Sequence, residues 1–195
     1  MAVDIDGVNS TISTDKLIPQ SGTALQIGES GDTVTLVGSA VGFGGGKVLQ
    51  IDFVHKSTMV SGSTLIPNDN TIPQNTEGVE VMTLAFTPTS ATSELLIQVN
   101  IFMGHSAAGT FHTIALFQDT TANALRATNS YHSQANKTNN YMMNHLMVAG
   151  TTSSTTFKVR LGAPDTGSVY FNGDSASVRY GGVSASSIMI MEYTP

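Results

Sequence analysis

Residues 94–103 read ELLIQVNIFM, and this stretch decides the fold. Its apolar side chains recur at every second position, at Leu95, Ile97, Val99, Ile101 and Met103. A period of two is the pattern of a β-strand with one buried face, whereas the side chains of a helix would repeat every three to four residues. The stretch therefore predicts a long strand in the core of a β-sheet.

Similar strand patterns recur along the chain, separated by residues that favour turns. No segment longer than a turn or two shows a helical period. The sequence therefore predicts an all-β protein with a C-terminal jelly-roll β-sandwich. The further predicted strands are Lys47–Lys56, Thr58–Ile66, Val79–Thr87, Thr110–Asp119, Ala124–Tyr131, Tyr141–Ala149, Thr155–Leu161, Ser168–Phe171 and Ser187–Tyr193.

Composition agrees with β structure and excludes several functions. Charged residues make up only 11% of the 195 residues, too few for the wet faces of long surface helices. The net charge is -6 and the eight Lys and Arg residues are scattered, so we expect no nucleic-acid binding. No apolar run is long enough to span a bilayer, so we expect no membrane insertion. Cysteine is absent, which excludes disulfides and thiolate metal sites.

A different pattern precedes the head, where residues 25–50 read LQIGESGDTVTLVGSAVGFGGGKVLQ. Apolar pairs at Leu25/Ile27 and Val34/Leu36 are separated by Gly and Ser, and a glycine-rich junction follows. One such ribbon cannot bury these side chains, whereas three copies wound around an axis can. A plain β-hairpin that caps the head is the alternative.

The chain is therefore expected to have three regions. Residues 1–20 are expected to be an extended N-terminal anchor, or a frayed terminus. Residues 21–46 are expected to form a short intertwined β shaft with its glycine junction. Residues 47–195 are expected to form the jelly-roll head.

Several predicted head strands are apolar on both faces, which calls for a second burial surface. The outward face of a sandwich strand in a monomer is normally polar, and large exposed apolar patches are rare on soluble monomers. Shaft and head both favour a homotrimer on this ground. The interface candidates are Leu25, Ile27, Val34, Leu36, Ile114, Leu116, Met142, Leu146, Met189, Met191 and Tyr193.

The order of these segments resembles that of bacteriophage fibre proteins. The resemblance rests on Leu25–Leu36 (LQIGESGDTVTL), Gly42–Gln50 (GFGGGKVLQ), Phe86–Ile97 (FTPTSATSELLI) and Arg179–Glu192 (RYGGVSASSIMIME). It implies a short fibre shaft and a trimeric jelly-roll tip of the kind seen in tumour-necrosis-factor-like and complement-C1q-like heads. Long tail fibres usually carry a sizeable N-terminal attachment domain, and here only about twenty residues precede the shaft. A tail fibre, a head fibre and a small capsid-bound spike therefore all stay open.

The function that this resemblance implies is that of a virion structural protein, assembled in the host cytoplasm. As a tail fibre it would bind a host surface glycan or outer-membrane protein during adsorption. Residues 1–20 would attach it to a baseplate, tail adaptor or capsid protein. The alternatives are a head fibre or capsid decoration protein and, less favoured, a glycan depolymerase. Because acidic residues are few, we expect no catalytic residues and no enzyme activity.

Receptor-binding residues are expected in loops at one end of the head, since loops on a rigid β scaffold carry recognition groups. Aromatic faces can stack on sugar rings and amides can bond to hydroxyls, although each residue could equally be a loop residue without a role. The candidates are Tyr131, His132, Asn136, Asn139, Tyr170, Asn172 and Tyr180.

Metal and cofactor sites are not expected. The five histidines lack HxH or HExxH spacing, although one His per chain could meet its copies on a three-fold axis. Asp165 and Asp174 lie near Asn172 in candidate loops, but they lack the spacing of a calcium-binding loop and are also ordinary turn residues.

Overall fold

The structure is a computed structural model that describes residues 46–175 and 177–194. Contacts within the chain divide it into two units, residues 1–44 and 45–195, and all of the described residues belong to the second unit. The predicted anchor and shaft lie outside the described residues, and so do the interface candidates Leu25, Ile27, Val34 and Leu36.

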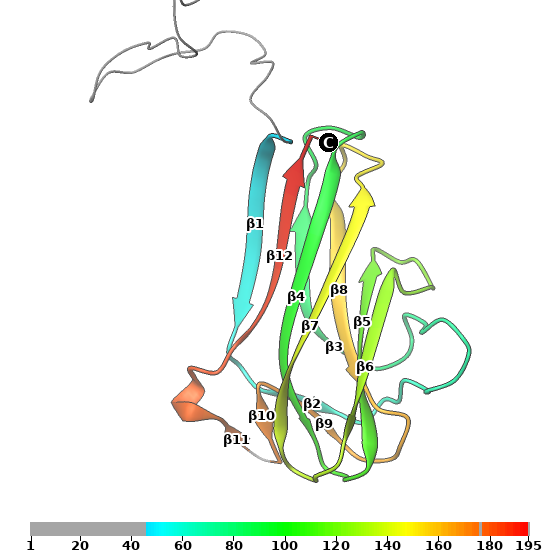
Figure 1. The fold of residues 1–195 in the computed structure, drawn as a ribbon, viewed down its shortest axis with the longest axis vertical. Helices are drawn as coiled ribbons and strands as arrows, with labels where there is room; N and C mark the ends of the chain where they lie inside the picture. The colour runs from blue at the N-terminus through cyan, green and yellow to red at the C-terminus, as the bar shows by residue number, and fades with distance from the viewer. Residues whose placement is uncertain (1–45, 176, 195) are drawn as a thin grey trace, which may run out of the picture. The chain divides into compact units, whose positions relative to one another are not determined.

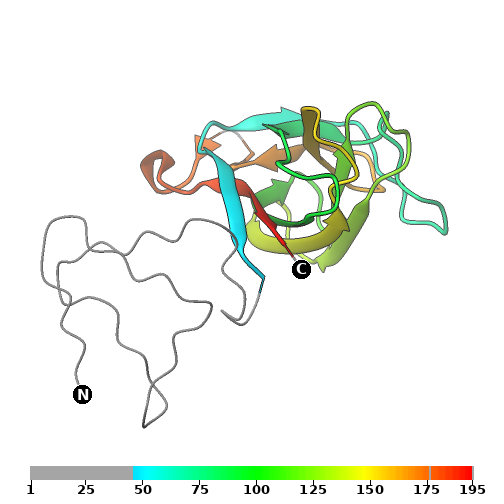
Figure 2. The same ribbon diagram turned by 90° about the horizontal axis from the view of Figure 1, so that it is seen from above.

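Two antiparallel sheets curve around the core between them (Figures 1 and 2). The first has the order β1-β12-β4-β7 and the second the order β3-β8-β5-β6. Because the chain passes repeatedly from one sheet to the other, the arrangement is consistent with a jelly-roll β-sandwich. The first sheet contains β1 (Val48–Lys56), β12 (Ser186–Tyr193), β4 (Glu94–His105) and β7 (Thr138–Val148), and the second contains β3 (Val79–Phe86), β8 (Thr155–Gly162), β5 (Thr110–Gln118) and β6 (Arg126–His132).

Shorter elements extend this frame. β2 (Val60–Gly62) and β9 (Val169–Phe171) extend the first sheet. β9 pairs with the last three residues of β4, Met103 to His105. β10 (Gly173–Asp174) and β11 (Ser177–Val178) pair as a small hairpin, and a single 3₁₀ turn follows at Tyr180–Gly182. In the described residues no helix is long and apolar enough to cross a membrane.

The period of two in β4 places its five predicted core residues between the sheets. Leu95, Ile97, Val99, Ile101 and Met103 are all buried. β8 alternates as cleanly, with buried Phe157, Val159 and Leu161 between the half-buried Lys158 and Arg160. At about 25 cal/mol per Å² of apolar surface, burial of these faces is the main term that stabilises the sandwich.

The two apolar faces of β5 are both covered by the chain itself. Ile114 and Leu116 are fully buried in the core between the sheets. On the opposite face, Ala115 and Phe117 pack with Ile66, from the β2–β3 connection, in a second buried cluster. The prediction that Ile114 and Leu116 contact another subunit is therefore wrong, because both side chains are buried between the two sheets and the β2–β3 connection covers the opposite face of β5.

The β2–β3 connection is held closely over the second sheet. The Ile66 amide donates to the Ala163 carbonyl at 3.1 Å, and the Gly78 amide donates to the Leu65 carbonyl at 2.9 Å. A Cβ atom on Gly162 would lie 2.4 Å from Ile66 Cγ1, so only glycine lets the connection approach β8 this closely.

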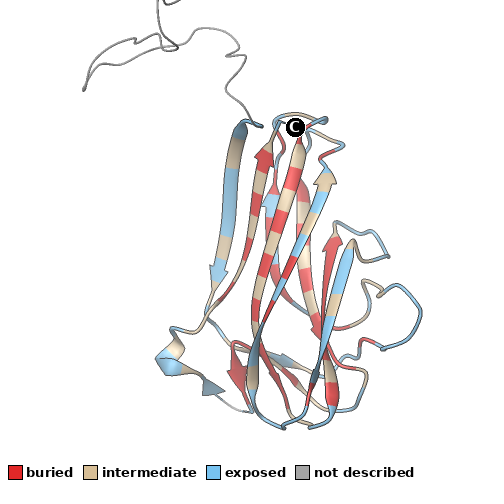
Figure 3. Ribbon diagram, viewed as in Figure 1, coloured by how far each residue is buried: buried red, intermediate tan, exposed pale blue. Residues whose placement is uncertain are grey.

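The first sheet has exposed positions along β1 and β7 (Figure 3), and several of the residues there are apolar. The strand register places Ile51, Met191, Leu96 and Leu146 opposite one another across β1, β12, β4 and β7. We call these four residues the apolar row. The interface candidates Met142 and Leu146 are 72% and 54% exposed. Three further candidates are half-buried on β12, namely Met189, Met191 and Tyr193.

Candidate binding site

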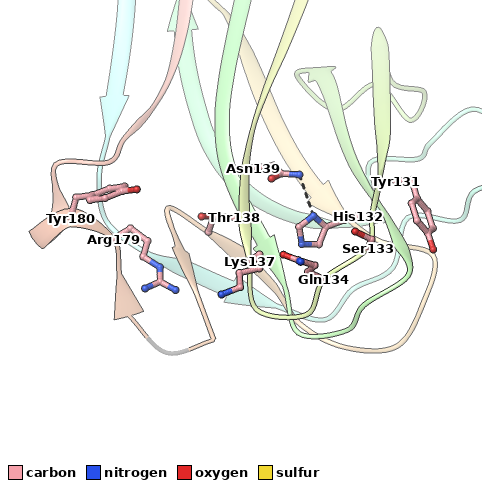
Figure 4. A pocket seen from close by; sticks show the side chains of 9 residues that line it. All are labelled: Tyr131, His132, Ser133, Gln134, Lys137, Thr138, Asn139, Arg179 and Tyr180. Carbon is pink, nitrogen blue, oxygen red and sulfur yellow. Dashed lines mark hydrogen bonds between the residues drawn. The ribbon is translucent and has the colours of Figure 1, made fainter.

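A pocket of about 640 Å³ lies at one end of the sandwich (Figure 4). This end is opposite the one where β1 begins and β12 finishes (Figure 1). Three segments form the pocket: the end of β6 with the following loop, the start of β7, and the connection between β11 and β12. The residues that line it are Tyr131, His132, Ser133, Gln134, Lys137, Thr138, Asn139, Arg179 and Tyr180.

The β6–β7 loop is fixed against the end of β4. The Asn136 amide donates to the His105 carbonyl at 2.8 Å, and Asn136 has the left-handed backbone conformation (φ 54°) that asparagine tolerates. A Cβ atom on Gly104 would lie 2.7 Å from the Lys137 carbonyl oxygen, so glycine at this position lets the loop approach. The pocket wall therefore rests on core strand β4.

The opposite wall carries Arg179 and Tyr180. Arg179 forms an ion pair with Asp174, whose side chain is buried. Tyr180 has φ 50° and is followed by Gly181 and Gly182, which also have positive φ. A bulky residue in the left-handed region is strained, and strain of this kind clusters at functional sites. Tyr180 is nevertheless 79% exposed, so burial of its ring does not offset that strain.

The charged side chains that line the pocket are both cations, although the buried Asp174 behind the lining pairs with Arg179. Lys137 and Arg179 line the pocket, and none of the described residues that line it is an Asp or Glu. The whole chain has a net charge of -6. Figure 4 shows the Lys137 and Arg179 side chains between Tyr131 and Tyr180, which stand at opposite sides of the view.

The inner wall continues into the core through a chain of hydrogen bonds. Asn139 Nδ2 donates to His132 Nδ1 at 3.1 Å and lies 3.3 Å from Tyr141 Oη. Tyr141 Oη in turn lies 2.8 Å from His112 Nδ1. Because the Asn139 amide nitrogen can only donate, His132 Nδ1 is an acceptor. The Tyr141 hydroxyl can donate to His112 Nδ1, and that arrangement places the proton of a neutral His112 ring on Nε2.

A third histidine completes a buried cluster of His105, His112 and His132. The Ala107 amide donates to His105 Nδ1 at 3.0 Å, so His105 has the same tautomer. The His112 ring stacks on the His132 ring, with centroids 4.4 Å apart. The His112 ring also meets the His105 ring at a tilt, with centroids 6.0 Å apart. All three Nε2 atoms are buried and have no hydrogen-bond partner among the described residues.

Burial favours the neutral imidazole in two members of the cluster, His112 and His105. Burial, followed by the neighbouring His132 and His105, lowers the pKa of His112 to about 3. Burial also lowers the pKa of His105, although the hydrogen bond with Ala107 and the charge of Asp165 act in the opposite direction. Burial raises the pKa of the Tyr141 hydroxyl.

This tautomer does not suit a metal site. A neutral histidine that ligates a metal through Nε2 must carry its proton on Nδ1, whereas here Nδ1 accepts a hydrogen bond. In the described part of the chain, no group of three His, Asp or Glu side chains is arranged to hold a metal ion. The two aspartates considered for calcium are engaged elsewhere, since Asp165 accepts from Thr110 Oγ1 at 2.6 Å and Asp174 pairs with Arg179.

The structure brings four of the seven receptor-binding candidates together in the pocket: Tyr131, His132, Asn139 and Tyr180. Asn136 lies in the same loop but does not line the pocket. Tyr170 lies on β9, in register with Ser61 and Gly104, and is likewise not among the lining residues.

Asn172 is a correction to the prediction. Its side chain is fully buried, Nδ2 donates to the Lys56 carbonyl at 2.6 Å, and Oδ1 accepts from Ser186 Oγ at 2.6 Å. These bonds join the start of β12 to the end of β1, so Asn172 stabilises the fold and offers no group to a receptor.

Sequence reasoning names Ser130–Asn140 and Asn172–Gly181 as candidate binding loops but does not single out five lining residues within them, namely Ser133, Gln134, Lys137, Thr138 and Arg179. The chain has only eight Lys and Arg residues, and two of them, Lys137 and Arg179, fall in predicted loops. This rarity could have indicated both residues as candidates for a binding site. Their proximity depends on the tertiary fold, which no local pattern reveals.

Comparison of the sequence with models of protein families finds no match, and comparison with curated proteins finds none either. Among solved structures, the chain is similar to an Eiger TNF from S. frugiperda, with 16% identity and a TM-score of 0.40 over 73% of this chain and 92% of that chain. It is similar to the C-terminal domain of EclA, a sugar-binding protein, with 16% identity and a TM-score of 0.32 over 77% and 88% of the two chains. It also matches a protein of the infectious bursal disease virus Gx strain, with 11% identity, a TM-score of 0.37 and coverage of 75% of this chain but 37% of that chain. These likenesses concern a coarse β-sandwich fold only.

Proposed function

We propose that this chain is a homotrimeric phage fibre protein whose head binds a host surface glycan or protein during adsorption. The observation that carries the proposal is the pocket at the loop end of the head. It combines two exposed tyrosines with amide, hydroxyl and cationic side chains. Pockets with a few convergent polar groups are the usual form of a ligand site, and aromatic residues with loop polar groups are typical of recognition surfaces.

The position of the pocket suits a fibre tip. The two ends of the head chain are tied together, because the Lys47 amide donates to Thr194 Oγ1 at 3.1 Å and the Thr194 amide donates to the Lys47 carbonyl at 3.0 Å. The pocket lies at the other end of the sandwich (Figure 1). A head that is attached through the residues before β1 would therefore leave the pocket accessible.

The trimeric state is supported by the exposed apolar row on the first sheet. Ile51 is 52% exposed and Leu146 is 54% exposed, at the two ends of a row that crosses four strands. Exposed apolar patches on soluble proteins mark interaction sites. Three equivalent pockets on one trimer would convert weak single-site binding into strong avidity.

Placement on a virion rests on the resemblance of the sequence to phage fibres, and we favour a tail fibre anchored through residues 1–20. The test is competition for adsorption. The purified full chain, added in excess, is expected to block attachment of the phage to its host cells. If adsorption is unchanged while particles that lack the protein lose a surface projection from the capsid, the protein is a decoration protein and the receptor-binding proposal is wrong.

A further inference from the structure

We propose that the pocket recognises an acidic sugar, with the carboxylate of the sugar placed between Lys137 and Arg179. This inference rests on the proposed function and deepens it, because it names the chemical class of the ligand.

The first step is charge. Two of the eight Lys and Arg residues of a chain with net charge -6 line one pocket. No carboxylate of the described residues lies within ion-pair distance of Lys137. Because Asp174 offsets the charge of Arg179, Lys137 supplies the net positive charge, which attracts an anion and favours it over a neutral competitor.

The second step is preorganisation. The buried Asp174 carboxylate holds the Arg179 guanidinium through Nη2 and Oδ2. A guanidinium carries five N–H donors, so one ion pair leaves donors for a ligand carboxylate. Because the buried Asp174 fixes Arg179, the ligand does not have to order that side chain on binding, which lowers the cost of association.

The third step is shape, which favours a ring-shaped ligand over a small inorganic anion. Tyr131 is 57% exposed, and its ring meets the Phe111 ring edge-on with centroids 5.4 Å apart, so Phe111 holds Tyr131 in place. Tyr180 stands at the other side of the view, beyond Lys137 and Arg179 (Figure 4). Each of these exposed rings can contact the apolar face of a different sugar unit of an oligosaccharide.

The fourth step is hydroxyl recognition. Ser133, Gln134, Thr138 and Asn139 also line the pocket, and together they offer both donors and acceptors. Sugar hydroxyls need both kinds of partner. The volume of about 640 Å³ lies within the range of small-ligand sites, about 300–1,000 Å³, and suits a short oligosaccharide.

The test is binding of the full chain to paired oligosaccharides. Each pair contains an acidic member, with glucuronic, galacturonic or sialic acid, and the same molecule with its carboxyl group reduced to an alcohol. At least one acidic member is expected to bind about tenfold more tightly than its reduced partner, the size of effect that one charge-assisted contact gives. High salt is expected to abolish this preference.

Two variants localise the effect. Lys137→Gln is expected to lose most of the preference for the acidic member. Lys158→Gln removes the same charge from a strand outside the pocket and is expected to keep the preference. If Lys158→Gln weakens binding as much as Lys137→Gln does, overall charge explains the result and the inference is wrong.

Other outcomes also decide the question. Equal binding of every acidic sugar and its reduced partner, or no binding by any of them, overturns the inference. Tight binding of sugar phosphates without binding of carboxylates overturns the assignment to a carboxylated sugar. The adsorption assay separates the two proposals, since a chain that blocks adsorption but ignores the acidic members keeps its receptor role and loses only this specificity.

Discussion

The rings of His112 and His132 stack on each other, with centroids 4.4 Å apart and planes inclined by 29°. His132 lines the pocket, whereas His112 is fully buried and bonds to Tyr141 in the core. The pocket wall and the interior of the sandwich are therefore directly connected by two titratable rings.

Acid is expected to destabilise the head through this stack. The pKa of His112 is about 3 in the folded chain, compared with the ordinary histidine value of 6.5 in the unfolded chain. Between these two pH values, His112 is therefore mostly protonated in the unfolded chain and neutral in the folded chain. The unfolded state then holds more protons, so stability falls with decreasing pH in this window by up to about 1.4 kcal/mol per pH unit for one such group. Urea unfolding at pH 7.5 and pH 5 measures the loss.

His112→Phe is the variant that tests this origin. It is expected to lower stability at pH 7.5 because Tyr141 loses its partner, and to reduce the further loss at pH 5. The loss should shrink without vanishing, since burial also lowers the pKa of His105 and His145. The control is His55→Gln on an exposed residue of β1, which should keep the original pH slope. An unchanged slope in His112→Phe would show that His112 does not cause the acid sensitivity.

Glu192→Gln is expected to cost roughly 2–4 kcal/mol of unfolding free energy. The Glu192 carboxylate on β12 is fully buried and accepts hydrogen bonds from the Thr89 amide at 2.9 Å and from Ser93 Oγ. It also accepts a bond from Gln50 Nε2 at 2.6 Å. These bonds hold the β3–β4 loop against the first sheet. Glutamine would turn an NH₂ group toward some of these donors.

Acid should also weaken this tie, at lower pH than the histidine stack. Burial alone would raise the pKa of Glu192, but the bonds from Ser93, Thr89 and Gln50 together lower it to about 2. The stability that they give is present above about pH 4.5 and is lost as pH falls towards 2. The matched control is Glu80→Gln, since the Glu80 side chain is 39% exposed and pairs with the half-buried Arg160 on the second sheet. It should cost less than about 1 kcal/mol.

Tyr180→Asn is expected to leave the melting temperature unchanged or raised while it weakens ligand binding. Asparagine tolerates the left-handed conformation at this position better than tyrosine does, and the exposed Tyr180 ring contributes little burial. Calorimetry and the oligosaccharide assay measure the two effects on the same sample. A large fall in melting temperature would mean that Tyr180 is a structural residue.

Leu146→Lys is expected to convert the proposed trimer to monomers, because it places a charge in the apolar row. Val183→Lys is the control, since Val183 is 82% exposed but lies in the connection before β12, outside that row. Sedimentation equilibrium of both variants and the original chain gives the masses. A trimer that survives Leu146→Lys would exclude the outer face of the first sheet as the interface.

The sequence predicts strands far better than it predicts what covers them. The alternation in β4 and β8 places their core residues correctly, because a period of two is a property of the strand itself. The second apolar face of β5 looks the same in sequence whether Ile66 of the same chain or another subunit covers it. The two-residue strands β10 and β11 are too short to leave a pattern.

For the candidate site, too, the sequence suggests some of the residues but does not show which of them the fold brings together. Residue chemistry suggests Tyr131 and Asn139 as recognition residues in loops, whereas the structure places Tyr131 near the end of β6 and Asn139 near the start of β7, where both line the pocket. The same reasoning fails at Asn172, since a turn-forming asparagine can equally use its amide to join two strands. Arg179 joins Lys137 only through the pairing of β10 with β11 and the path of the chain into β12.

Binding of the labelled full chain to intact host cells tests the central claim most directly. The original chain is compared with Tyr131→Ala combined with Lys137→Gln, after circular dichroism has shown that both are folded. The original chain is expected to bind saturably and the double variant to lose most of that binding. Equal binding of the two proteins would contradict the assignment of the pocket as the receptor site.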